Sequence, residues 1–149
     1  MVFALGALLH KEKTAFVRFT YVDPANPGLA LTGIPLEITP AEPHYKGKVV
    51  VLVNEQSISQ SEYTAMAFRS VPGAVVIGST TAGADGNVSQ IPLPGGYRTM
   101  ISGLGVFYPD MRPTQRVGIV PDIVVSPTIE GVKAGKDELV DAAIRHILK

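Results

Sequence analysis

The sequence contains no cysteine. This absence excludes disulfide bonds, a thiolate nucleophile and zinc sites built on cysteine ligands. It does not indicate a compartment, because proteins of reducing and of oxidising compartments can both lack cysteine.

The sequence also lacks net charge and long apolar runs. Thirteen basic residues balance thirteen acidic ones, and no block of like charge occurs, so nothing favours binding to nucleic acid or to an anionic membrane. The apolar start, Val2 to Leu9, is too short to span a bilayer and has no basic segment before it, so we expect a short helix there. With 149 residues and 46% hydrophobic content, the chain suits one domain or part of one.

A strand–helix–strand unit is expected near the middle of the chain. The apolar run Val49–Val53 predicts a strand covered on both faces, Ser61–Arg69 a helix that Val71-Pro72-Gly73 ends, and Ala74–Gly78 a second buried strand. Parallel strands joined in this way place their carboxyl ends at one sheet edge. The loops 54–62 and 79–87 should both leave from that edge.

The remaining segments predict a mixed α/β domain. We expect a strand over 15–22, a proline-rich surface segment over 23–43 with a short hairpin at 29–32, a hairpin from 88–93 and 97–102 that 103–108 extends, an extended stretch over 117–125, and a helix from Lys136 to Leu148 that packs on the sheet. No internal repeat and no interdomain linker is present. The prediction is an α/β fold with a βαβ core, an extra hairpin and a C-terminal helix, in one unit over residues 1–149.

The turn from Asn54 to Glu62 permits two interpretations. Ser59-Gln60-Ser61-Glu62 fits the S-x-x-E capping box, in which the serine and the glutamate satisfy free backbone donors at a helix start. A serine between a buried strand and a helix N-terminus also suits acyl transfer, because negative charge is favoured there. Capping boxes are far more common, so the spacing alone favours the structural interpretation.

Other motifs carry less chemistry. Gly78–Gly83 matches half of a phosphate loop, but Ala84 and Asp85 replace the required lysine and hydroxyl, so we reject nucleotide binding. Asp85-Gly86 is typical of a turn. The three histidines, His10, His44 and His146, are expected at the surface, without a paired acid or metal-ligand spacing.

Four segments together resemble the catalytic domain of the C-terminal processing (tail-specific) serine peptidases, in particular their tricorn-like branch. The order and spacing agree from about Tyr45 to Val125. The segments are Lys46–Glu55, Ser59-Gln60-Ser61-Glu62, Val75–Gly83 and Gly118-Ile119-Val120-Pro121-Asp122-Ile123.

The resemblance implies a Clp protease/crotonase-like fold and peptide hydrolysis without a cofactor or a metal. It assigns Ser59 as the nucleophile and the backbone N–H of Gln60 as an oxyanion donor, with a polypeptide as substrate. Ser61 and Glu62 would then be structural, and Ser57 is the nearest competing hydroxyl. The family's location points to the bacterial periplasm or cell envelope, although no residue here directs export.

The sequence departs from the family at the general base. The family's T-x-G-K loop carries a lysine, and the matching Thr81-Ala82-Gly83-Ala84 carries alanine. In the tricorn-like branch the base is a histidine from an upstream region, so we expect this chain to be the C-terminal portion of a catalytic domain, inactive alone, that pairs with that upstream part. Oligomeric state and cleavage specificity stay open.

The alternative is a non-catalytic binding module of the same fold that holds a peptide or an apolar ligand, as the interphotoreceptor retinoid-binding repeats do. An acyl-CoA-handling crotonase relative is a weaker third hypothesis.

Overall fold

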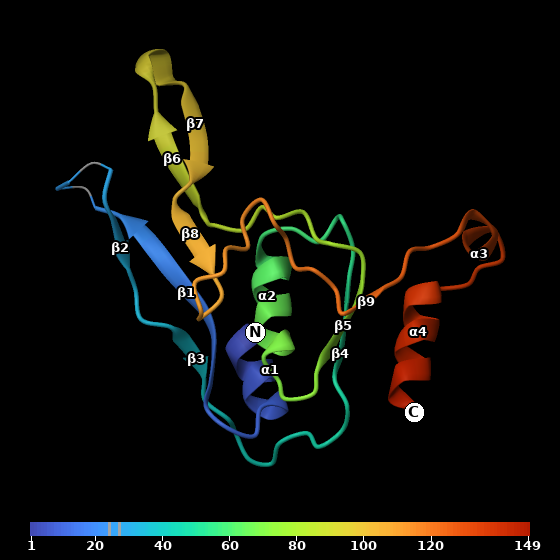
Figure 1. The fold of residues 1–149 in the computed structure, drawn as a ribbon. Coiled ribbons are helices and arrows are strands. Elements are labelled where there is room, and N and C mark those ends of the chain that lie inside the picture. Colours follow the sequence, from blue (N-terminus) through green and yellow to red (C-terminus); the bar gives the residue numbers. More distant parts are fainter. Residues whose placement is uncertain (24, 27) are drawn as a thin grey trace.

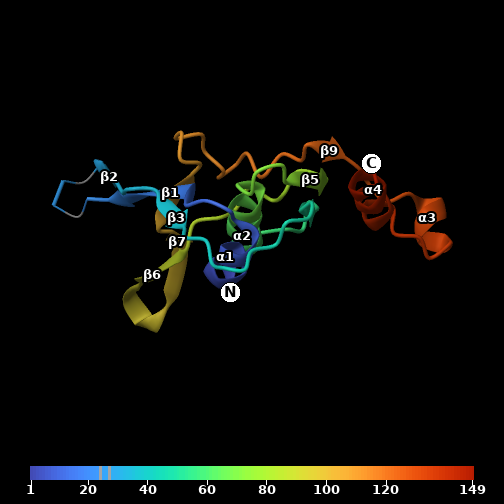
Figure 2. The same cartoon turned by 90° about the horizontal axis from the view of Figure 1, so that it is seen from below.

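The computed structural model describes residues 1–23, 25–26 and 28–149; Pro24 and Pro27 of the proline-rich segment lie outside the described residues. Two sheets lie on either side of the central helix α2, a two-stranded hairpin projects from the molecule, and a further helix lies at the far end of an elongated shape (Figures 1 and 2). The elements are α1 (Val2–Leu9), β1 (Thr14–Val22), β2 (Ala30–Thr32), β3 (Leu36–Ile38), β4 (Val50–Val53), α2 (Gln60–Arg69), β5 (Val75–Gly78), β6 (Val88–Pro92), the 3₁₀ turn η1 (Pro94–Gly96), β7 (Arg98–Ser102), β8 (Leu104–Phe107), β9 (Ile123–Val124), α3 (Ile129–Lys133) and α4 (Glu138–Ile147).

The expected βαβ unit is present. Strands β4 and β5 are parallel, with Val50 opposite Val75 and Val53 opposite Gly78, and α2 connects them. Strand β9 adds to the other side of β5, also in parallel. The expectation that both faces of β4 are covered is wrong, because the alternation of a strand turns Leu52 outward and leaves it 40% exposed.

The segment 104–107 does not extend the hairpin as expected. It forms β8, which pairs with β1 in antiparallel register from Arg18 opposite Phe107 to Tyr21 opposite Leu104. The physical reason is burial, since this pairing brings Val106 into the core at 1% exposure. Strand β1 also pairs with β2 and β3, so the hairpin expected within 29–32 is formed by β2 against β1.

Strands β6 and β7 form the predicted hairpin. They pair from Val88 opposite Ser102 to Pro92 opposite Arg98, with the Pro94–Gly96 turn at the tip. The hairpin projects away from the rest of the molecule (Figures 1 and 2), and every residue of both strands is exposed.

The main core lies between α2 and the strands around it. It contains Phe16 and Val17 of β1, Met66 of α2 and Val76 of β5, each at most 1% exposed. Helix α1 packs against α2 and β3 at the edge of this core. A smaller cluster joins Ile77 to Ala142 and Ala143, which confirms that the C-terminal helix packs on the sheet.

His10 lies inside the protein, so the expectation of a surface histidine is wrong for it. Its ring is fully buried, with Nδ1 2.8 Å from the Gly6 carbonyl oxygen and Nε2 2.9 Å from the Ser70 hydroxyl. The first bond lies within α1, and the second connects the end of α1 to the end of α2. A short helix, α3, appears where none was expected, and among the described residues no helix is long and apolar enough to cross a membrane.

Candidate active site

The backbone of Ser59 has an unusual conformation. The serine lies between β4 and α2 as the N-cap of α2, with φ 55° and ψ −117°. Positive φ is uncommon for a residue other than glycine and costs of the order of 1–3 kcal/mol, so such residues concentrate at functional sites. A strained serine at a sharp strand-to-helix turn also presents its hydroxyl at the sheet edge, and here Ser59 is exposed.

Glu62 is the hydrogen-bond centre of the turn. Its side chain is fully buried, and its carboxylate accepts four hydrogen bonds. Oε2 accepts from the N–H groups of Ser59 at 3.1 Å and Ala84 at 2.9 Å, and Oε1 accepts from the Gly83 N–H at 2.7 Å and from the Thr81 hydroxyl. The glutamate half of the predicted capping box is therefore present. It does more than cap α2, because it also holds the loop that follows β5.

The two loops at the carboxyl ends of β4 and β5 lie together, as predicted. The Ala82 N–H donates to the Ser57 carbonyl at 3.0 Å, and the Ser79 hydroxyl donates to Glu55 Oε2 at 2.6 Å. Thr81 accepts from the Ile119 N–H at 2.7 Å through its hydroxyl oxygen. These bonds fix the backbone on both sides of Ser59.

A hollow of about 390 Å³ lies beside Ser59. Its volume suits one or two side chains of a bound peptide. It is lined by Phe19, Ser59, Gln60, Tyr63, Asp85, Asn87, Leu104 and Val106. The rings of Phe19 and Tyr63 are stacked with centroids 6.2 Å apart, and so form an aromatic part of the wall. The β1–β8 sheet thus supplies one side of the hollow and α2 supplies the other.

Asp85 is buried in the wall of this hollow, where the sequence predicted only a turn. It is 7% exposed, and its Oδ1 accepts from the Gly86 N–H at 2.8 Å. Its Oδ2 is buried and accepts no hydrogen bond from any described residue. Burial raises the pKa of Asp85 to about 6, against the opposing effect of the Gly86 hydrogen bond, and the charge of Glu62 adds to the rise. Burial also raises the pKa of Tyr63, and the charge of Asp85 adds to it.

Gln60, the predicted oxyanion donor, lies at the start of α2 beside Ser59. Gln60 is the first residue of α2 and lines the hollow with Ser59. Within the described residues, no hydrogen bond uses its backbone N–H. An N–H group at a helix start is a good donor for developing negative charge.

No side chain that lines the hollow, among the described residues, is a histidine or a lysine. Ala84 stands in the loop that Glu62 holds and contributes only its N–H. His10 is engaged in the core, His44 lies 3.0 Å from Glu42, and His146 is in the last turn of α4. In the described part of the chain, Ser59 and Gln60 thus line the hollow with Asp85 and without a histidine or a lysine.

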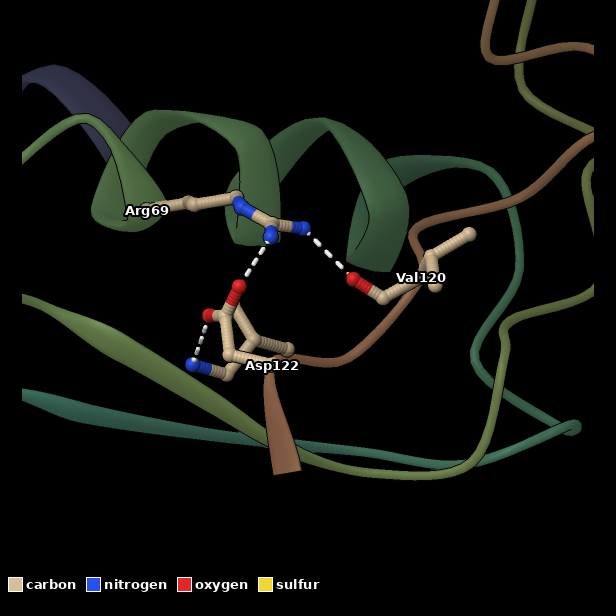
Figure 3. A network of polar contacts seen from close by, with 4 residues as sticks. Arg69, Val120 and Asp122 are labelled. Carbon is tan, nitrogen blue, oxygen red and sulfur yellow. Dashed lines mark hydrogen bonds and ion pairs between the residues drawn. The ribbon is translucent and has the colours of Figure 1, made fainter. Parts of the chain in front are cut away.

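The Gly118–Ile123 segment has a structural role in this chain (Figure 3). Asp122 pairs with Arg69 at the end of α2, and its Oδ2 accepts from the Val76 N–H of β5 at 2.8 Å. Arg69 also donates to the Val120 carbonyl at 2.6 Å. Gly118 has φ 77°, and a Cβ there would lie 2.5 Å from the Thr81 carbonyl oxygen, so this position needs glycine. The segment therefore supports the loop that carries Thr81.

The sequence named Ser59 and Gln60, which both line the hollow, but it did not indicate Asp85 or the full role of Glu62. The positive φ of Ser59 was not foreseen either. The one signal for Asp85 was its place directly after the loop at the end of β5, at the functional edge of the sheet. Its burial arises in the tertiary structure, where distant residues such as Gln115 contact it, so local turn chemistry could not reveal it.

The fold and this turn define a class of protein: a peptidase-like α/β domain of the Clp protease/crotonase type. The chain belongs to peptidase family S41, whose profile matches residues 9–125. This result confirms the resemblance and the fold class expected from the sequence. A comparison with curated proteins finds no match.

Solved structures agree with this fold. A candidate peptidase from Parabacteroides merdae ATCC 43184 superposes with a TM-score of 0.90 at 24% identity, over 99% of this chain and 47% of that one. Mature CPAF, in a complex with lactacystin, superposes with a TM-score of 0.78 at 15% identity, over 95% of this chain and 40% of that one. The tricorn protease superposes with a TM-score of 0.52 at 19% identity, over 93% of this chain and 12% of that one. The chain thus spans about half, or less, of the proteins it resembles.

Proposed function

We propose that this chain carries the nucleophile of a serine endopeptidase and that Ser59 forms the acyl-enzyme. The observation that carries the proposal is the backbone of Ser59, a non-glycine residue at φ 55° between β4 and α2. Such strain persists only when surrounding bonds hold it, and here Glu62 accepts from the Ser59 N–H and from the loop after β5. A helix cap alone requires no such conformation.

In the proposed reaction, the Ser59 hydroxyl attacks a peptide carbonyl that lies in the hollow. The Gln60 N–H stabilises the oxyanion, and a base removes the hydroxyl proton and then returns it to the leaving amine. Water then hydrolyses the ester and restores the serine. The base comes from a part of the gene product outside these 149 residues, because the side chains around Ser59 include no histidine or lysine within the described chain.

The test uses the gene product that contains this chain and an unfolded polypeptide as substrate. We expect hydrolysis that Ser59→Ala reduces by at least about a hundredfold. Ser61→Ala is the matched control, because Ser61 is exposed in the first turn of α2 and does not line the hollow. The 149-residue chain alone should be inactive. Hydrolysis that survives Ser59→Ala would refute the proposal.

A binding module of the same fold is the second candidate. The observation that favours it is the same missing base together with the partly aromatic hollow. It predicts a gene product that binds peptides in the hollow but does not hydrolyse them. Saturable peptide binding without turnover, in the gene product with all its segments, would favour this candidate over the peptidase.

A further inference from the structure

The buried side chain of Asp85 lines the hollow, and one of its two carboxylate oxygens lacks a partner. Oδ1 has its hydrogen bond from Gly86, whereas the buried Oδ2 has none among the described residues. No ion pair that involves a described lysine, arginine or histidine includes Asp85. Buried polar groups in native proteins are nearly always satisfied, so an unsatisfied carboxylate requires an explanation.

The surroundings of Asp85 indicate what would satisfy it. Phe19, Tyr63, Leu104 and Val106 give the hollow apolar walls, and Asp85 is its one acidic lining residue among those described. Ser59, Gln60 and Asn87 add uncharged polar groups to the lining. A hollow with an apolar part and one carboxylate in its wall complements a side chain with an aliphatic stem and a cationic end. Lysine and arginine are the side chains with that form.

Glu62 cannot serve this purpose. Both of its oxygens are saturated by donors from Ser59, Thr81, Gly83 and Ala84, and it does not line the hollow. Of the two buried carboxylates near Ser59, one therefore holds the backbone in place, and the other has an oxygen that accepts no hydrogen bond from a described residue.

We propose that Asp85 is a specificity-determining residue that receives a basic side chain, lysine or arginine, of the polypeptide substrate in the hollow beside Ser59. The inference rests on the proposed function, because the position of Ser59 beside the hollow defines which peptide bond of a bound polypeptide would be cleaved. Binding of the basic side chain itself does not require chemistry at Ser59. The two ideas can therefore fail separately.

The experiment measures binding to the gene product that carries Ser59→Ala, so that no peptide is consumed. The probes are two fluorescent pentapeptides, Ala-Ala-Lys-Ala-Ala and the same peptide with norleucine in place of lysine. Norleucine keeps the aliphatic stem and lacks the ammonium group. We expect the lysine peptide to bind about tenfold or more tightly, since a hydrogen bond to a charged partner in a buried site is worth at least that factor.

The decisive variant adds Asp85→Asn to Ser59→Ala. Asparagine keeps the shape and the acceptor for Gly86 but removes the charge. We expect the two peptides then to bind within about twofold of each other. Asp110→Asn is the matched control, because Asp110 is an exposed carboxylate that pairs with Arg112 and does not line the hollow. With this control variant the preference for lysine should persist.

Three results would overturn the inference: no measurable binding of the lysine peptide, equal binding of the two peptides before Asp85 is changed, or a preference that survives Asp85→Asn. If Asp85→Asn abolished the reaction of Ser59 with a fluorophosphonate and left the preference intact, Asp85 would belong to proton transfer instead. A lysine preference in a protein whose Ser59 is unreactive would sustain the inference and refute the peptidase.

Discussion

Glu62 Oε2 accepts a hydrogen bond from the backbone N–H of Ser59 at 3.1 Å. The same carboxylate also accepts from the loop after β5, through the N–H groups of Gly83 and Ala84. One buried side chain thus connects the serine turn to the neighbouring loop. The strained conformation of Ser59 and the position of the loop that leads to Asp85 depend on the same group. Four donors would lose their acceptor if the carboxylate were removed.

Glu62→Ala should therefore destabilise the chain by about 3–5 kcal/mol, because it leaves buried donors without a partner. Glu62→Gln should cost less, of the order of 2 kcal/mol, since it keeps one good acceptor but places an amide N–H₂ against backbone donors. Urea unfolding followed by circular dichroism measures both. Glu55→Gln is the control: Glu55 is exposed in the same turn, and its change should barely move the urea midpoint. Equal effects of the two Gln variants would contradict the role of Glu62.

The strain at Ser59 predicts a difference between two variants that both lose the hydroxyl. Ser59→Gly should leave the chain about 1 kcal/mol more stable than Ser59→Ala does, because glycine adopts φ 55° without a steric penalty. The larger entropy of glycine in the unfolded chain reduces this gain and is included in the figure. Urea unfolding of the pair gives the difference directly, and a more stable alanine variant would show that the turn is relaxed.

The charged carboxylate of Asp85 should lower the free energy of unfolding at neutral pH. Its pKa in the folded chain, about 6, lies above its usual value, so the folded state disfavours the charged form. The folded state then binds more protons than the unfolded state between about pH 4 and pH 6, and the free energy of unfolding falls as the pH rises through that window. Asp85→Asn removes this penalty and should stabilise the chain by about 1–2 kcal/mol at pH 7, with little gain at pH 4.

Unfolding curves of the two proteins at pH 4 and pH 7 test this prediction. Glu62 and Tyr63 are the other titratable groups that act on Asp85 or respond to it, and both are present in each protein. A loss of stability in Asp85→Asn at pH 7 would mean that the carboxylate is needed by the fold, which the binding inference does not predict.

The Arg69–Asp122 pair should support the site indirectly. Asp122→Ala removes the partner of Arg69 and the acceptor of the Val76 N–H, and we expect a loss of about 1–2 kcal/mol, limited because both side chains are partly exposed. Asp122→Asn keeps one acceptor and should lose less. Unfolding by urea ranks the two, and equal losses would show that the negative charge, and not the acceptor, is what matters there.

Local patterns predicted the elements near the site. The apolar runs of β4 and β5, the helix between them and the turn of the β6–β7 hairpin all depend on residues close in the sequence. Ser59 was found because a strand-to-helix turn and a family pattern coincide at it. The pairing of β8 with β1 could not be read locally, because Val106 and Phe19 are brought together only by the register of distant strands.

Buried polar groups were the systematic failure. His10 stands in a charged stretch of sequence, yet the packing of α1 on α2 encloses it against Ser70. Asp85 has the sequence of a turn, yet its side chain is buried, and Gln115, thirty residues away, donates to its carbonyl oxygen at 2.8 Å. Composition predicts an exposed side chain in both cases, and only tertiary contacts determine that these two are enclosed.

The most direct test of the central claim is the site of covalent reaction. The gene product that contains this chain is treated with a fluorophosphonate, digested and mapped by mass spectrometry, with Ser59→Ala and Ser61→Ala in parallel. The account predicts one adduct on Ser59, absent from Ser59→Ala and retained in Ser61→Ala. Equal labelling of the Ser59→Ala protein, or an adduct on Ser57, would contradict it.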